Sequence, residues 1–501
     1  MSTTQTNLLN TFGGKQLEEI IQEIKSLYLH NKTPWVIGYS GGKDSTTVTQ
    51  LVYMALKELT YEERHKTIYV LSSDTKVETP AIVNHVDVTL DMIQKAAVKD
   101  GLPIHCVKVE PNASNTFWVN LLGRGYPAPS QQFRWCTDRL KIKPANRFIS
   151  EQVSRYGEVI MALGVRSDES ASRAQTINKN KDKYNPDSLL SRHSTLSGAY
   201  VYPAIKEFST DDVWTFLLQN ESPWGFDNNS LLSLYRSASA GECPLVIDSS
   251  SSSCGNSRFG CWTCTVVTED KALTAMVENG EEWLEPLLDF RDMLAKTQKN
   301  KDKYRTHKRR KGGVNWIVRK TEKNPDGTQK EREVRSMEMS YGPYKFEYLK
   351  KFLKELLITE KKVNDENPTE DYFELISLPE LEEIRKLWKS ELADWDDSVP
   401  KIYEAALQKP YPLTNVKGGG FSGADYALLD QICVEEGVET GMIAKMLDTA
   451  RSFDGLKRRT KALSSIEKVL KEEWRSKEEI IASKELKLER RGINLEKGAQ
   501  Q

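Results

Sequence analysis

Two serines, two glycines, a lysine and an aspartate stand together in "SGGKDS", the segment from Ser40 to Ser45. Glycine lets a backbone turn tightly and approach a ligand, and the free N–H groups at the start of a helix bind anions, phosphate above all. Lys43 adds a cation. Asp44 adds carboxylate oxygens, which Mg²⁺ accepts alongside phosphate oxygens. A bare Gly-Gly would indicate an ordinary turn, but this combination predicts a phosphate site.

The residues around this segment have the pattern of a strand, a glycine turn and a helix. The apolar run from Trp35 to Tyr39 precedes it, and apolar residues recur at helical spacing after it. Further apolar runs follow at Ile68 to Leu71, Ile104 to Val109 and Val159 to Gly164, with helical stretches at Pro80 to Lys99 and Ala145 to Tyr156. This alternation predicts an α/β fold with a doubly wound parallel sheet, in which ligands bind beyond the carboxyl ends of the strands.

Two further polar stretches fall at such strand ends. "SSDTKVETP" supplies Asp74, Thr75 and Glu78, and "LGVRSDESASR" supplies Arg166, Ser167, Glu169, Ser170 and Arg173. Taken singly, either stretch could be a capped turn or a solvated loop. After them, Ser209 and Asp212 have the spacing of a capping box and predict the start of another helix.

The glycine segment lacks the Gly-x-x-x-x-Gly-Lys-Ser/Thr spacing of a Walker loop. "SGGKDS" resembles instead the PP-loop of the ATP pyrophosphatase superfamily, whose members cleave ATP between the α- and β-phosphates and transfer AMP to an acceptor. The resemblance implies that pyrophosphate is held by Ser40, Gly41, Gly42, Lys43 and Ser45, while Asp44 helps to hold Mg²⁺.

The Asp-Thr pair and the Gly-x-Arg-x-x-x-Ser-x-x-Arg run resemble one branch of that superfamily, the adenylylsulfate and phosphoadenylylsulfate reductases. The likeness covers about residues 30 to 265. It implies that Asp74 and Thr75 contact the nucleotide and that Arg166 acts in catalysis with Lys43 and Asp44.

Four of the seven cysteines have the arrangement of a metal or cluster site. Cys254, Cys261 and Cys264 come from one segment, a tetrahedral site needs a fourth ligand, and Cys136 in "RWCTDRLKIKP" is the candidate. In the reductase branch a similar cysteine ligates a [4Fe–4S] cluster with a later Cys-x-x-Cys pair. The resemblance therefore implies such a cluster on these four, although the family's double cysteine is single here. Cys243 is a reserve ligand.

A four-cysteine zinc site is the alternative to the cluster. The remaining two cysteines, Cys106 in a predicted strand and Cys433 in a predicted amphipathic helix, are expected to be buried apolar residues.

The sequence contains two clusters of basic residues whose function it does not decide. One surrounds Cys136 and consists of Arg124, Arg134, Arg139, Lys141, Lys143 and Arg147. The other has nine Lys/Arg residues between Lys296 and Lys311 against one acid, Asp302. Such local density attracts a nucleic-acid backbone, but a charge run is also typical of a solvated face.

Composition sets the outer limits. The net charge of -1 predicts no general attraction to nucleic acid, so any basic surface must be local. We expect a cytoplasmic protein with no membrane association, because no apolar run approaches the ~20 residues of a membrane span and no signal peptide is evident. The predicted domains are 1–236 (PP-loop domain), 237–271 (cysteine-rich segment), 272–417 (helices, basic run and hairpin) and 418–501 (C-terminal helices).

The cysteine positions also discriminate between activities. Sulfonucleotide reductases need a redox-active cysteine in a C-terminal tail or an attached thioredoxin module, whereas Cys433 is the only cysteine after Cys264. Over nearly its full length the chain resembles the sulfur-inserting family of bacterial DNA phosphorothioation, DndC. That resemblance implies ATP-dependent sulfur insertion into the DNA backbone, with a cysteine desulfurase and an ATPase as partners. A tRNA thiolase, an adenylylsulfate or phosphoadenylylsulfate reductase and an iron–sulfur DNA-binding regulator stay open.

Overall fold

The computed structural model describes residues 11–167, 189–193, 195–237, 260–320, 334–369, 371–412, 421–453 and 461–490. The chain forms two compact units. The first comprises Met1–Phe117, Pro129–Arg291 and Glu366–Phe373, and the second comprises Trp118–Ala128, Asp292–Asp365 and Glu374–Gln501. The division into four sequence segments stays a prediction.

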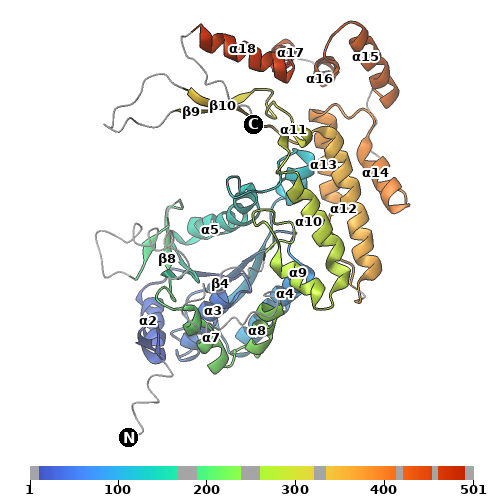
Figure 1. The fold of residues 1–501 in the computed structure, drawn as a ribbon. Helices are drawn as coiled ribbons and strands as arrows, with labels where there is room; N and C mark the ends of the chain where they lie inside the picture. The colour runs from blue at the N-terminus through green and yellow to red at the C-terminus, as the bar shows by residue number, and fades with distance from the viewer. Residues whose placement is uncertain are drawn as a thin grey trace. The chain divides into compact units, whose positions relative to one another are not determined.

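A six-stranded sheet with the order β5-β4-β3-β6-β8-β7 forms the centre of the first unit (Figure 1). The strands are β3 (Trp35–Gly38), β4 (Ile68–Ser73), β5 (Ile104–Val109), β6 (Val159–Ala162), β7 (Ser191–Arg192) and β8 (Ala199–Tyr202). All neighbours pair in parallel except β7, which runs antiparallel to β8. The predicted α/β fold with a mainly parallel sheet is confirmed, although β7 and β8 were not predicted.

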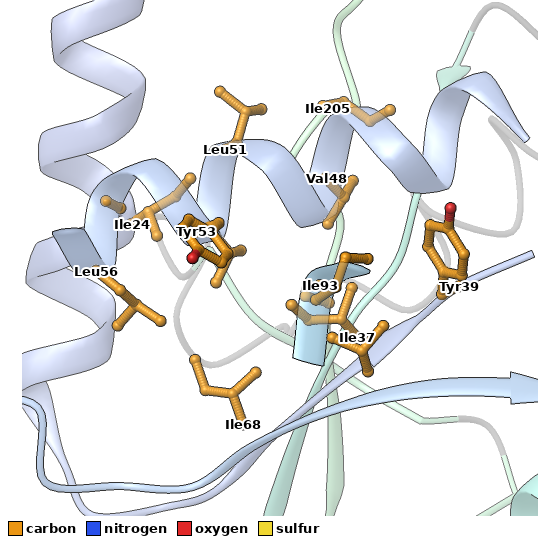
Figure 2. Packing of buried hydrophobic residues seen from close by; sticks show 14 of the residues in the cluster. Ile24, Ile37, Tyr39, Val48, Leu51, Tyr53, Leu56, Ile68, Ile93 and Ile205 are labelled. Carbon is orange, nitrogen blue, oxygen red and sulfur yellow. The ribbon is translucent and has the colours of Figure 1, made fainter. Parts of the chain in front are cut away.

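Both faces of the sheet carry an apolar core. Trp35 and Ile37 of β3 enter one core, and Val36 between them enters the other, as the alternation of side chains along a strand requires. The first core is covered by α2 (Leu17–His30), α3 (Lys43–Lys57), α4 (Pro80–Lys99), α7 (Thr210–Gln219) and α8 (Asn228–Ser237). Figure 2 shows Val48 and Leu51 of α3 above Ile37. The second core is covered by α5 (Lys143–Tyr156).

The strand order places a switch point between β3 and β6. The chain passes from β3 to β4 on one side, whereas β6 lies on the other side of β3 and leads on to β8. Ile37 of β3 pairs with Ala162 of β6, so the segments after these two strands emerge next to each other. Ligands of open α/β sheets bind at such a point.

Shorter elements complete the first unit. They are the antiparallel pair β1 (Thr11–Phe12) and β2 (Lys15–Gln16), the 3-10 turns η1 (Ala113–Asn115) and η5 (Glu282–Leu284), the π-helix η3 (Thr137–Ile142) and the helix α9 (Lys271–Glu278). The predicted capping box of α7 is confirmed, since the Ser209 and Asp212 side chains each bond the backbone N–H of the other.

The second unit is mainly helical, as predicted. Its helices are α11 (Lys301–Tyr304), α12 (Phe346–Glu366), α13 (Leu378–Glu391), α14 (Ser398–Leu407), α15 (Gly423–Glu435), α16 (Thr440–Arg451), α17 (Ala462–Leu470) and α18 (Lys477–Glu489), and α10 (Glu285–Lys296) enters it from the first unit. The predicted hairpin pairs β9 (Asn315–Lys320) with β10 (Val334–Ser340), and its predicted turn lies outside the described residues. The π-helix η2 (Val119–Gly123) is buried here, and Trp388 Nε1 donates to the Leu122 carbonyl.

Membrane-spanning helices are not found within the described ranges, where every helix is too short or too polar for the task.

Candidate active site

The segment Ser40–Ser45, called the glycine loop below, connects β3 to α3 in a backbone shape that requires glycine. Gly41 has φ +73°, and a Cβ there would lie 2.7 Å from Val86 Cγ2. Gly42 caps the helix, so that α3 begins at Lys43. The Ser45 hydroxyl donates to the Gly42 carbonyl at 2.9 Å and accepts from the Ser40 N–H at 3.2 Å. The Ser45 side chain therefore fixes the loop against the first turn of α3. The N-terminus of a helix in this position is typical of an anion site.

Asp44 lies between two cations at this helix start. Its Oδ1 is 2.7 Å from Arg166 Nε and its Oδ2 is 2.8 Å from Lys43 Nζ. Arg166 is only 3% exposed. It follows β6 and Asp44 follows the neighbouring strand β3, so the ion pair joins the segments after these two strands. The three residues predicted to act in catalysis are thus brought together.

Gly164 makes this meeting possible. A Cβ on Gly164 would lie 2.9 Å from both the carbonyl carbon and the oxygen of Asp44, closer than real side chains approach. The segment after β6 therefore packs directly on the backbone of the first turn of α3.

A cavity of about 290 Å³ opens beside the loop at the carboxyl ends of the strands. Its apolar walls come from Val36, Leu71, Ile82, Val83, Val86, Ile149, Met161 and Leu163. Its polar rim includes Ser40, Asp74, Glu78, Lys108 and Lys141. Apolar walls with a few polar groups are typical of a small-molecule site.

The predicted nucleotide-contacting pair, Asp74 and Thr75, connects this cavity to the cysteines. Asp74 Oδ2 lies 3.4 Å from Lys108 Nζ at the cavity rim. Thr75 donates its N–H to Glu78 Oε2 at 3.1 Å, and its Oγ1 lies 3.3 Å from Cys261 Sγ. One turn after β4 therefore contacts both the cavity and a thiol.

The Cys261–Cys264 segment is fixed against the same turn. Cys261 forms an antiparallel bridge with Glu78, and the Trp262 N–H donates to the Val77 carbonyl at 3.0 Å. Trp262 is buried, and the Cys264 N–H closes a turn onto the Cys261 carbonyl at 3.0 Å. The Arg291 guanidinium holds the Cys264 carbonyl at 3.0 Å. Both cysteines are thus positioned by backbone contacts rather than by a disulfide.

Cys136 joins them from the start of η3. Burial and the neighbouring Cys264 thiol raise the pKa of Cys136. Burial, with the charge of Glu78, raises the pKa of Cys261 to about 12. Lys141 has a raised pKa because of Cys261 first, and then of Glu78, Cys136 and Cys264. One half-exposed lysine thus interacts with three thiols, which places three of the four predicted ligands near one another.

The donor set suits a soft metal or a cluster, because cysteine sulfurs from separate segments converge there. Cys254 and the reserve ligand Cys243 lie outside the described residues. Within the described part of the chain, no group of three His, Cys, Asp or Glu is arranged to hold a single metal ion.

Other predicted residues have local roles or lie elsewhere. Arg139 donates to Asn115 Oδ1 at 2.8 Å, Arg147 donates to Asn112, and Lys143 pairs with Asp138, so part of the basic cluster around Cys136 fixes neighbouring loops. Glu169, Ser170 and Arg173 fall outside the described residues. Cys433 is buried as predicted, and Cys106 is partly buried.

Two side chains at the glycine loop were not predicted. His85 Nε2 lies 2.9 Å from the Gly41 carbonyl oxygen, and the Lys43 N–H donates to the Tyr235 hydroxyl at 3.2 Å. A single histidine in an amphipathic helix gives no functional signal. Tyr235 lies 192 positions from Lys43, and only the fold brings the two together.

Comparison with known proteins agrees with this geometry. Residues 34–267 match the family model described as "Phosphoadenosine phosphosulfate reductase domain". Over these residues the chain is similar to that family's domain. The chain is also 27% identical over 210 residues to "Uncharacterized protein MJ0066" of Methanocaldococcus jannaschii. That match covers 41% of this chain and 36% of the relative, so it spans little more than a third of the relative's length.

Two solved structures are similar over part of the chain. Phosphoadenylyl-sulfate reductase from Candida auris has 13% identity and a TM-score of 0.26, covering 42% of this chain and 88% of its own. The U34-tRNA thiolase NcsA from Methanococcus maripaludis, solved with its [4Fe-4S] cluster, has 18% identity and a TM-score of 0.24, covering 39% of this chain and 62% of its own.

The close approach of Gly164 to Asp44 gives a direct test of the anion site. Gly164→Ala should weaken binding of inorganic pyrophosphate by about tenfold or more, because the added Cβ must displace the first turn of α3, which carries the N–H groups. Isothermal titration calorimetry measures this. Gly313→Ala is the matched control, since a Cβ there meets nothing within 4 Å. Unchanged affinity in Gly164→Ala would show that the anion binds elsewhere.

Proposed function

We propose that this protein is an ATP-dependent sulfurtransferase of the DndC kind, which adenylylates a DNA backbone phosphate and replaces one of its oxygens with sulfur. The observation that carries the proposal is that one cavity is lined both by the glycine loop and by residues next to Cys261. Ser40 of the glycine loop lines it on one side, and Glu78, Lys141 and Gly260, which surround Cys261, line it on the other. A nucleotide bound there would have its phosphates near the loop and the reacting centre near the thiols.

The glycine loop would hold the leaving group. In this proposal the N–H groups at the start of α3 and the Lys43 ammonium bind the β- and γ-phosphates of ATP, and the apolar cavity walls contact the base. A non-bridging oxygen of the DNA phosphodiester attacks the α-phosphorus, and the bond to the β-phosphate oxygen breaks. Arg166 and Lys43 stabilise the developing negative charge. Pyrophosphate leaves, and the backbone phosphate carries AMP.

Asp44 is the residue that would hold Mg²⁺. One of its oxygens lies 2.8 Å from Lys43 Nζ and the other lies 2.7 Å from Arg166 Nε. If Lys43 pairs with the bound phosphates instead of with Asp44, one Asp44 oxygen becomes available to the metal. Bound Mg²⁺ would supply charge neutralisation on the phosphates.

Sulfur transfer completes the reaction. Sulfur at the sulfide level, supplied by a cysteine desulfurase and a reductant, attacks the activated backbone phosphorus, and AMP leaves as the second product. A phosphorothioate results. The thiol segments would position this step because Cys261 forms a backbone bridge with Glu78, which lines the cavity.

In this proposal the cysteines would hold a [4Fe–4S] cluster rather than zinc. Cys136, Cys261 and Cys264, with Cys254, would be its ligands, because cysteine sulfur is the usual ligand of such clusters. Such a cluster would supply a place for sulfur or an electron.

The basic run supports a nucleic-acid substrate in part. Some of its cations serve the second unit itself, since Arg305 donates to the Tyr341 and Gly342 carbonyls and Arg310 pairs with Glu391. Lys308 Nζ lies 3.8 Å from the centre of the Trp474 ring. The exposed members are Lys296, Lys299, Lys301, Lys303, Arg309, Arg310 and Lys311. These are suited to phosphate-backbone contact.

The reaction class predicts the nucleotide product. With Mg²⁺, DNA and a sulfur donor, the protein should form AMP and pyrophosphate rather than ADP. Asp44→Ala should lower that rate by about a hundredfold or more, because the metal ligand and the partner of Arg166 are both lost. Chromatographic product analysis measures it. Asp91→Ala, an exposed change on α4, is the control. Supplying tRNA instead of DNA separates the thiolase alternative, which predicts sulfur in tRNA alone.

The cysteine assignment predicts the metal content. Anaerobically purified protein should contain iron and acid-labile sulfide in equal amounts, and Cys136→Ser or Cys261→Ser should lose most of both. Cys433→Ser should retain them, because Cys433 is a buried residue of α15 in the second unit, whereas the thiol segments belong to the first unit. Elemental analysis that finds one zinc per chain and no sulfide would contradict the cluster.

A further inference from the structure

His85 of α4 forms a hydrogen bond with the backbone of the glycine loop. The Nε2 atom of His85 lies 2.9 Å from the Gly41 carbonyl oxygen. The imidazole packs edge-on against Phe226, with ring centres 5.2 Å apart, and it does not line the cavity. The bond requires the proton on Nε2, since a carbonyl can only accept.

This bond fixes a peptide group rather than a side chain. A trans peptide is planar, so the Gly41 carbonyl and the Gly42 N–H point in opposite directions. Because His85 takes the carbonyl, the Gly42 N–H points away from α4.

The next peptide group is fixed as well. The Lys43 N–H donates to the Tyr235 hydroxyl at 3.2 Å. The Gly42 carbonyl therefore points away from Tyr235, into α3, where it accepts from the Thr46 N–H at 3.0 Å and the Ser45 hydroxyl at 2.9 Å. Of the two peptide groups around Gly42, the one N–H that these contacts leave for a ligand is that of Gly42.

Two adjacent glycines make such control necessary. The peptide group between Gly41 and Gly42 is flanked by two residues that have no Cβ. In the absence of a hydrogen bond it can therefore rotate at little energetic cost. Rotation by half a turn would aim the Gly41 carbonyl oxygen where the N–H had pointed. A phosphate would then meet a partial negative charge instead of a donor.

We propose that His85 is a positioning residue, which holds the Gly41–Gly42 peptide so that its N–H faces the ATP phosphates. The inference rests on the proposed function, because it takes ATP as the ligand of the glycine loop. His85 acts through the backbone and does not contact the substrate.

Three ligands and two substitutions test the role in the full-length protein. His85→Phe retains the aromatic contact with Phe226 and removes the donor, and His85→Gln can place an amide N–H near the same carbonyl. Calorimetric titration with ATP, inorganic pyrophosphate and adenosine gives the affinities. His85→Phe should weaken ATP and pyrophosphate by about five- to tenfold, the value of one hydrogen bond, and leave adenosine unchanged. His85→Gln should recover most of the loss.

His105→Phe is the matched control, because His105 is an exposed residue of β5. Wild-type affinity for pyrophosphate in His85→Phe would overturn the proposal. An equal loss for adenosine would also overturn it, since the residue would then be only structural. If the expected affinities are found but AMP never forms, His85 keeps its role and the proposed function fails. If the wild-type protein binds none of the phosphates, both fail.

Discussion

The contact between Arg166 and Asp44 determines how the predicted catalytic residues meet. It joins the segment after β6 to the first turn of α3 across the switch point of the sheet, at 2.7 Å between Arg166 Nε and Asp44 Oδ1. The contact exists only because Gly164 lets the two backbones touch. Both Asp44 oxygens face cations, so the helix start presents opposite charges side by side. A ligand with phosphates and a metal can exchange with each of them.

The second constraint is the turn after β4. Asp74 faces the cavity, Thr75 contacts Cys261, and Glu78 pairs with Cys261 along the backbone. These contacts join a nucleotide-sized cavity to the thiol segments over a few residues. The proposed activation and sulfur transfer would require such proximity, because the activated phosphate would have to reach the sulfur before water does.

Local patterns made the core of this arrangement predictable. The run Trp35 to Tyr39, the glycines and the helical spacing after them predict β3, the loop and α3, and the structure has all three. Parallel pairing could be inferred because helices separate the strands. β8 was not predicted, although it has four residues like β3 and β6, and the β7 pairing was missed because two residues carry no pattern.

The contacts around the loop could not be predicted in the same way. His85 and Tyr235 meet the glycine loop from 44 and 192 positions away, through single polar atoms that leave no periodic signal. The basic run shows the reverse case. Its charge density is plain in the sequence, yet only the structure separates Arg305 and Arg310, which make internal contacts, from the exposed lysines.

Isotope exchange between pyrophosphate and ATP tests the central claim most directly. If the glycine loop holds pyrophosphate while AMP passes to a DNA phosphate, the first step is reversible. Labelled pyrophosphate should then enter ATP when DNA and Mg²⁺ are present, and not when DNA is omitted. Label entering ATP from inorganic phosphate and ADP, with none from pyrophosphate, would contradict it.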